Sequence, residues 1–323
     1  MDAQEPWRPR GRRVAGERGG GLRARLTSPG RVVRLTLASA TSATLVVLAL
    51  ACLAVPLGAT MVGCGVEVGP TQQFVIEEPL GGAGVTDIVI KMGAGSLTVG
   101  PGASGLISGV VRYNVAEWKP ELTRSTSRLS IKQGGPKGLT GWSGDIVNHW
   151  DLRLGKAPMR LEVEAGAYEG EYELGGLTLQ SLRIKDGAAK TEVTFSEPNP
   201  GRLEVFRYET GASSVALKGL ANANFALLEF KGGAGSYTLD FGGELRSAGR
   251  VRIEAGVGKV RLVFPAGTPA RVTVDGSLND ISAEGPWVKK DKTYSIEATA
   301  GRAGSNLDIV VKMSVGKLEL VAQ

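Results

Sequence analysis

The chain is poor in the side chains on which metal, redox and thiol chemistry depend. Its 323 residues include two cysteines, Cys52 and Cys64, and a single histidine, His149. Because no cysteine follows Cys64, the rest of the chain can form neither an internal disulfide nor a zinc site built on thiolates, and one imidazole excludes a multi-histidine site. The sequence therefore predicts no metal site and no cofactor.

The body of the chain also lacks an excess of either charge. Residues 1–34 contain nine arginines and three acidic residues, which accounts for the whole formal net charge of +6. Since residues 35–323 contain equal numbers of basic and acidic side chains, the composition indicates no basic patch of the kind that follows phosphates. No nucleic acid partner is therefore predicted.

The N-terminal region has the layout of an export signal or a membrane span. No charged residue occurs between Arg34 and Glu67, and Ala43–Val62 is largely apolar. The segment ends in Met-Val-Gly-Cys-Gly at 61–65, which resembles the end of a bacterial lipoprotein signal, with Cys64 as the lipidated first residue of the mature chain. The alternative is an uncleaved span of about 20 residues. Both alternatives anchor the body to the cell membrane, outside the cytoplasm.

We therefore expect three parts in the chain. Residues 1–34 form a basic cytoplasmic or signal region, residues 35–63 the hydrophobic export or membrane segment, and residues 64–323 one extracytoplasmic domain. Glycine is abundant in the chain, at 47 residues, while 42% of all residues are hydrophobic, a combination that favours many short strands joined by tight turns over disorder.

Small-residue turns recur along this domain. Their centres are Gly93, Gly166, Gly187, Gly211, Gly233 and Gly256, with weaker copies near Ser277 and Ser314. From Gly166 onward the spacings are 21, 24, 22, 23 and 21 residues. Apolar residues two apart flank each centre on both sides, as in Leu182 and Ile184 before Gly187, which indicates two strands with one buried face each. Positive φ or a close backbone approach explains glycine at the bend. The sequence predicts an all-β, elongated β-solenoid of stacked repeats, each about 20–24 residues long.

The outward positions supply a second indication of stacking. Two residues before successive centres stand side chains of alternating charge: Glu164, Lys185, Glu209, Lys231 and Glu254. If successive repeats stack in register about 4.8 Å apart, these side chains form a column of opposite charges that disfavours slips of register.

Six short segments of the sequence form a recognisable set: Cys64–Gln72, Met92–Gly95, Tyr113–Pro120, Asn148–Leu152, Gly232–Gly235 and Leu239–Phe241. With these segments the sequence resembles the toast-rack family of bacterial cell-surface proteins. The resemblance implies a β-repeat fold and a surface lipoprotein, related to adhesin-like domains and to membrane proteins that restrain envelope-stress signalling, such as the inhibitory protein of the Lia system. It implies no catalytic activity and assigns no functional residues.

Two groups of residues invite a catalytic interpretation. His149 lies beside Asp151, but no nucleophile motif such as G-x-S-x-G accompanies them, so we expect a structural role. Glu169, Glu171 and Glu173 alternate along one strand, about 6.6 Å apart, a separation that suits a glycoside-cleaving pair of carboxylates. The simpler interpretation is a solvent-exposed strand face.

The long interval between Gly93 and Gly166 is the place where we expect specific function. It contains Trp118, His149, Trp150 and Asp151, and we predict that these residues border the contact surface for an envelope protein or a glycan. The alternative is a hydrophobic cap on the end of the stack.

The overall prediction is a non-enzymatic, membrane-anchored binding or scaffold module, which modulates envelope-stress signalling or serves another envelope role. The alternative is a polysaccharide-acting β-solenoid lyase or glycoside hydrolase. A cleft lined by several acids and an arginine or lysine would favour the enzyme.

Overall fold

The structure is a computed structural model that describes residues 68–82, 84–135, 145–276, 280–297 and 306–323. In these ranges the chain forms sixteen β-strands and one short 3-10 helix, η1 (Ala116–Trp118). The all-β prediction is confirmed. Within the described residues no helix is both long and apolar enough to span a bilayer.

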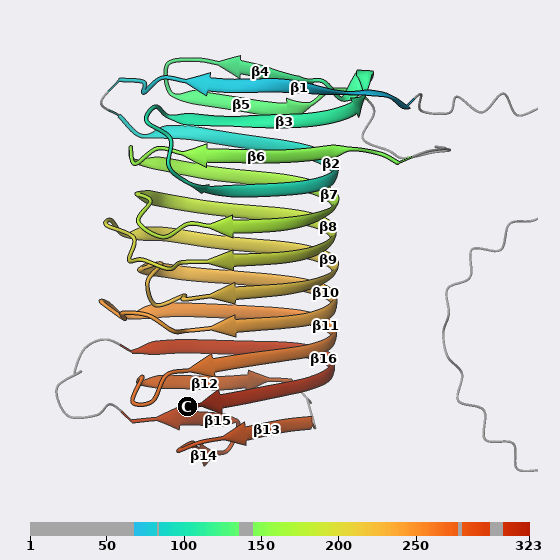
Figure 1. The fold of residues 1–323 in the computed structure, drawn as a ribbon. Helices are drawn as coiled ribbons and strands as arrows, with labels where there is room; N and C mark the ends of the chain where they lie inside the picture. The colour runs from blue at the N-terminus through green and yellow to red at the C-terminus, as the bar shows by residue number, and fades with distance from the viewer. Residues whose placement is uncertain (1–67, 83, 136–144, 277–279, 298–305) are drawn as a thin grey trace, which may run out of the picture. The chain divides into compact units, whose positions relative to one another are not determined.

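The middle of the domain is a stack of long strands, each bent near its centre (Figure 1). These strands are β2 (Thr86–Pro101), β7 (Met159–Glu173), β8 (Leu179–Thr194), β9 (Leu203–Lys218), β10 (Phe225–Asp240), β11 (Gly249–Phe264) and β16 (Leu307–Ala322). Each pairs in parallel with its neighbours over both halves, and the register aligns the predicted turn glycines from Gly93 to Gly256. The stacked repeat predicted from the spacing is therefore confirmed.

The two halves of each strand enclose the core. Leu182 and Ile184 in the first half of β8 and Val193 in its second half are fully buried. Across the fold of β10, Phe230 packs on Tyr237 with ring centroids 4.9 Å apart. Similar contacts run along the stack, because Tyr208 stacks on Phe230 of the next strand at 5.6 Å. Inward residues thus form continuous apolar columns, as the alternation in the sequence predicts.

Close backbone approach explains the glycine at each bend. A Cβ atom on Gly233 would lie 2.5 Å from the carbonyl oxygen of Gly211, and one on Gly256 would lie 2.5 Å from that of Gly233. Positive φ occurs two residues further on instead, at Gly95, Gly258 and Gly316, with values of 134°, 139° and 138°. Close backbone approach and positive φ therefore both require glycine, at different positions of the same bend.

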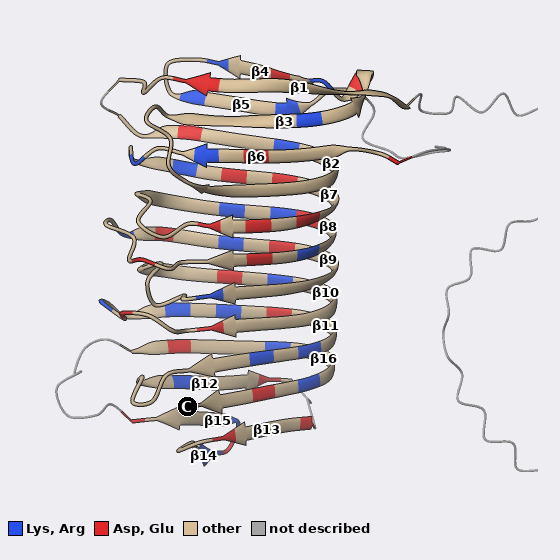
Figure 2. Cartoon of the chain, viewed as in Figure 1, with Lys and Arg blue, Asp and Glu red and all other residues tan. Residues whose placement is uncertain are grey.

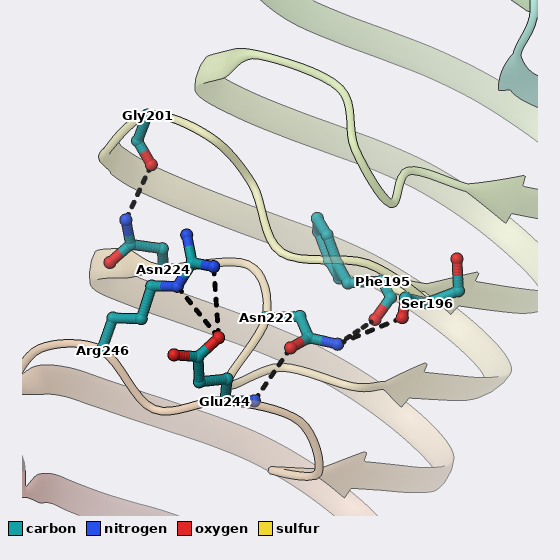
Figure 3. A network of polar contacts seen from close by, with 7 residues as sticks. All are labelled: Phe195, Ser196, Gly201, Asn222, Asn224, Glu244 and Arg246. Atoms are coloured by element: carbon teal, nitrogen blue, oxygen red, sulfur yellow. Dashed lines mark hydrogen bonds and ion pairs between the residues drawn. The ribbon is translucent and has the colours of Figure 1, made fainter.

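Asparagines hold the loops that connect successive strands on the side away from the bends (Figure 3). Asn222 Nδ2 donates to the carbonyl oxygen of Phe195 at 2.9 Å, and its Oδ1 accepts from the Glu244 amide at 2.8 Å. Asn224, at φ 50°, donates to the Gly201 carbonyl at 2.8 Å. The loop that contains Asn222 and Asn224 is thereby hydrogen-bonded to the loop before it and to the loop after it.

The N-terminal end of the stack is closed by antiparallel strands. β6 (Asn148–Leu154) pairs in parallel with the second half of β2. β3 (Ile107–Val115) pairs antiparallel with β6, and β1 (Val68–Glu78) pairs antiparallel with β3. β5 (Arg128–Gln133) pairs in parallel with the first half of β2, and β4 (Pro120–Arg124) pairs antiparallel with β5. Most of the residues between Gly93 and Gly166 therefore form the N-terminal end of the stack.

At the C-terminal end the strands do not stack in chain order. β16, the last strand, lies between β11 on one side and β12 (Ala270–Asp275) and β13 (Asp280–Glu284) on the other. β15 (Thr293–Ile296) and β14 (Val288–Lys290) then close this end antiparallel. The weaker bend copy at Ser314 aligns with Gly256, whereas Ser277 lies outside the described residues. The expectation that successive repeats are neighbours is wrong here.

The charges of the outward column agree with this order. In the outward column predicted from the sequence, the insertion of β16 places Lys312 between Glu254 and Asp275. Chain-order stacking would put these two carboxylates on adjacent strands, about 4.8 Å apart, where like charges repel.

The column alternates in sign from Lys91 to Asp275, and Lys91 contacts Glu164 at 2.7 Å. Figure 2 shows acidic and basic residues alternating from one strand to the next along the stack. The register that we predicted for the column is confirmed. Glu209, however, pairs with Arg183 and Arg207 of the adjacent column, at 3.8 and 4.0 Å.

The bend predicts a steric penalty that can be measured. Gly233→Val should lower the free energy of unfolding by more than about 1 kcal/mol, because its side chain has to displace the Gly211 carbonyl of the next strand. Gly82→Val is the matched control, since a Cβ there meets nothing within 4 Å, and its stability should stay within about 0.5 kcal/mol of wild type. Equal urea midpoints for both variants would contradict the close approach.

Candidate functional site

A groove of about 630 Å³ crosses the outer face of the second half of the sheet. It extends from β6 over β2, β7 and β8 to β9 and is lined by Thr98, Val99, Arg153, Glu169–Glu173, Lys190, Thr191, Glu192, Thr194, Ser214 and Ala216. The groove is hollow because outward positions on its two flanks carry the short side chains of Thr98, Ser214 and Ala216. We call it the glutamate groove.

Three exposed glutamates, a partly buried fourth and two cations give the glutamate groove its charge. Glu169 and Glu171 are exposed on β7, and Glu192 of β8 is the register partner of Glu171. Glu192 is bound by Lys218 Nζ at 2.7 Å. Arg153 contacts Asp151 at 2.9 Å, and Lys190 is the register partner of Glu169. The arrangement presents a mixed, mainly acidic surface to solvent.

The third of the predicted glutamates has a structural contact. Glu173 Oε1 accepts hydrogen bonds from the Gly175 amide at 2.7 Å and from the amide and hydroxyl of Ser196 at 3.2 and 2.9 Å. These bonds tie the turn after β7 to the turn after β8, so this carboxylate stabilises the loops.

His149 has a serine partner that the sequence did not reveal. Its Nδ1 lies 2.5 Å from the Ser96 hydroxyl on the neighbouring strand β2, and both side chains belong to the outer face. Asp151 contacts Arg153. In a Ser-His-Asp triad the serine bonds Nε2 and the carboxylate bonds Nδ1, so this arrangement differs from a triad. Sheet register alone joins Ser96 to His149, and no local motif could have shown it.

The two predicted tryptophans are buried. Trp118 in η1 is 2% exposed and Trp150 in β6 is 1% exposed. Trp150 Nε1 donates to Asn148 Oδ1 at 2.8 Å, and Asn148 Nδ2 donates to Gln133 Oε1 at 3.0 Å. Both tryptophans belong to the packed N-terminal end of the stack, which agrees with the alternative of a hydrophobic cap.

The predicted contact surface therefore depends on His149 and Asp151, which are exposed beside the glutamate groove. That they border a partner's binding surface stays a prediction. Cys64, the predicted lipidation site, lies outside the described residues.

The same spacing analysis could have found the rest of the glutamate groove. Lys190 and Glu192 stand three and five residues after Gly187, as Glu169 and Glu171 stand after Gly166. Once the bends align, these four side chains must form one patch. Repeat spacing could not have predicted the position of Arg153, because β6 belongs to the irregular N-terminal end of the stack.

Residues 67–205 match the family model of the N-terminal domain of toast_rack, DUF2154. The chain carries a toast-rack N-terminal domain. The family resemblance seen in the sequence is thereby confirmed. The toast-rack domain includes β2, β7 and β8, with most of the glutamate groove, and ends within β9, although the stack continues in the same register to β16.

Solved structures with a similar course of chain have low sequence identity. A candidate cell adhesion protein from Clostridium sporogenes is 16% identical, covers 79% of this chain and all of its own length, and has a TM-score of 0.45. Candidate adhesins from Bacteroides fragilis and Parabacteroides distasonis are 7% and 9% identical, with TM-scores of 0.31 and 0.30. Both cover 79% of this chain, and 97% and 98% of their own. No curated protein matches the sequence.

The toast-rack domain also contains a buried carboxylate, Asp186, next to the bend of β8. Tyr208 donates its hydroxyl to Asp186 Oδ2 at 2.6 Å, and Thr210 and Ser213 bond its Oδ1. Burial raises the pKa of Asp186, and the hydroxyl donors lower it in part. Burial likewise raises the pKa of the nearby Tyr168 to about 12.

Asp186 predicts a pH dependence of stability. In the unfolded chain an aspartate titrates near pH 4, whereas the folded pKa is higher, so between these values the folded state binds more protons. The stabilisation by protonated Asp186 is full below about pH 4 and is lost as the pH rises through the folded pKa. Urea unfolding from pH 4 to 7 should show wild type losing stability relative to Asp186→Asn. Parallel curves for the two proteins would contradict the raised pKa.

Proposed function

We propose that the protein is a non-enzymatic binding module of the cell envelope, which contacts its partner through the glutamate groove. The observation that carries this proposal is the form of the groove: a shallow, charged surface on a rigid sheet, spread over five neighbouring strands. Several of its charges are already paired, such as Glu192 with Lys218 and Arg153 with Asp151. An exposed, partly paired surface suits recognition of a large partner better than proton transfer to a small substrate.

Membrane anchoring is part of the proposal. It is supported by the apolar segment 35–63 after an arginine-rich leader, and by Cys64 at its end. The stack would then lie outside the cytoplasm, with the glutamate groove open to the envelope. We include in the proposal that the protein modulates envelope-stress signalling, which the toast-rack relationship supports.

A second candidate is a polysaccharide-cleaving enzyme. The observation that favours it is that the groove combines Glu169, Glu171 and Glu192 with Arg153 and Lys190. Glu171 and Glu192 are register partners on neighbouring strands, about 5 Å apart at their Cα atoms, and both side chains are exposed. A retaining glycosidase requires about 5–5.5 Å between the two carboxyl groups themselves.

One experiment separates the two candidates. The purified full chain is incubated with isolated cell envelopes, and both the bound fraction and the release of reducing sugar ends are measured. We expect binding without release, and a loss of about tenfold in affinity for the double variant Glu169→Gln, Glu171→Gln at an unchanged melting temperature. The matched control is Glu204→Gln, Glu284→Gln, which removes the same charge from exposed positions outside the groove.

Two results would contradict the binding proposal. Release of reducing ends that stops in Glu171→Gln would assign the groove to the enzyme. Equal affinity of the groove variant and the control would show that the glutamates do not contact the partner.

A further inference from the structure

A second groove, of about 560 Å³, crosses the outer face of the first half of the sheet near the C-terminal end of the stack. Its lining combines four arginines with one aspartate and small or apolar residues: Arg202, Ala226, Leu227, Ala248, Gly249, Arg250, Arg252, Arg271, Asn306 and Asp308. We call it the arginine groove. The balanced charge of residues 35–323 concealed it, because net charge says nothing about where charges gather.

The insertion of β16 creates the spacing of this groove. Asp308 of β16 is the register partner of Arg250 on β11 and of Arg271 on β12. The two arginines are therefore two strands apart, about 10 Å, with one carboxylate between them. Figure 2 shows this order at the starts of the three strands.

The four arginines differ in how they are engaged. Arg202 is held by Asn224 Oδ1 at 3.1 Å, by the Ala248 carbonyl at 2.8 Å and by the Ser247 hydroxyl. Arg252 contacts Glu229 at 3.5 Å. Arg250 and Arg271 are exposed, and neither makes an ion pair within 4 Å in the part of the chain that the structure describes.

This arrangement suits an extended anionic ligand. A guanidinium group presents a planar fork of donors that matches carboxylate and phosphate oxygens, and it keeps its charge at every relevant pH. Arg202 is held by its hydrogen bonds, whereas Arg250 and Arg271 make no ion pair with any other residue that the structure describes. Asp308 opposes one of the positive charges, so the groove favours anions spaced along a chain over one small ion seated between the two arginines.

We propose that the arginine groove binds an anionic glycan polymer of the envelope, through its repeated carboxylate or phosphate groups. The envelope as the source rests on the proposed function, which places the stack outside the cytoplasm. A nucleic acid fits less well, because no aromatic side chain lines the groove to stack on bases. Ala226, Ala248 and Gly249 add small residues to the lining, which leaves room for a sugar backbone.

The test compares three forms of the full chain, purified in a non-ionic detergent. The first is Arg250→Gln, Arg271→Gln, and the second is Arg250→Lys, Arg271→Lys, which keeps the charge but removes the fork. The third is the matched control Arg112→Gln, Arg128→Gln, at exposed positions near the other end of the stack. All forms have the same N-terminal region, so any binding by that region is common to them.

Affinity is measured at low salt for polygalacturonate, poly(glycerol phosphate) and neutral dextran, with melting curves for each form. We expect at least one of the two anionic polymers to bind about tenfold more weakly to the glutamine double variant than to the control, with dextran unbound by all forms. The polymer affected identifies carboxylate or phosphate as the group recognised. The lysine variant should fall between the two.

Equal affinities of the glutamine variant and the control for both anionic polymers would overturn the proposal. Single-stranded DNA or polyglutamate bound as tightly, with the same dependence on Arg250 and Arg271, would assign the groove to another class of partner. The outcome is independent of the glutamate groove: if envelope binding fails there while polymer binding persists here, the proposed function falls and the anion site stands.

Discussion

The close approach of one backbone to the next at each bend is the constraint on which the rest of the structure depends. A glycine at the centre lets its neighbour's carbonyl oxygen come within a distance that no Cβ atom tolerates, as Gly233 and Gly211 show. With the bends locked in line, the two halves of every strand stack in one register. Inward residues then fill a continuous core, and outward residues fall into columns whose members come from distant parts of the sequence.

The charges in those columns agree with the observed strand order. Each exposed pair contributes less than about 1 kcal/mol, so a single pair decides little. At the C-terminal end, however, two columns favour the same strand order. Lys312 separates Glu254 from Asp275, and Asp308 separates Arg250 from Arg271. Both are satisfied when β16 lies between β11 and β12. The same insertion sets the spacing of the arginine groove.

The regular part of the fold could be predicted from the sequence, and the ends could not. The spacing from Gly166 to Gly256 predicts the stack because each repeat contacts only its neighbours. The insertion of β16 is a contact between distant segments, and no local pattern specifies it. Trp118 and Trp150 show the same limit, since aromatic residues in an irregular segment suit a surface and an end cap equally well. Half of the glutamate groove follows from the repeat spacing, whereas Arg153 joins it only through the pairing of β6 with β2, which also brings His149 to Ser96.

Disulfide formation between introduced cysteines tests the order of the last strands most directly. Glu254→Cys is combined either with Lys312→Cys or with Asp275→Cys, and the full chain is oxidised and mapped by peptide mass spectrometry. Directly paired parallel strands bring Cα atoms within the range of 4.4–6.8 Å that a disulfide requires, and strands separated by a third do not. We expect the 254–312 pair to close and the 254–275 pair to stay reduced. Closure of 254–275, with 254–312 reduced, would show that the strands stack in chain order and would contradict this account.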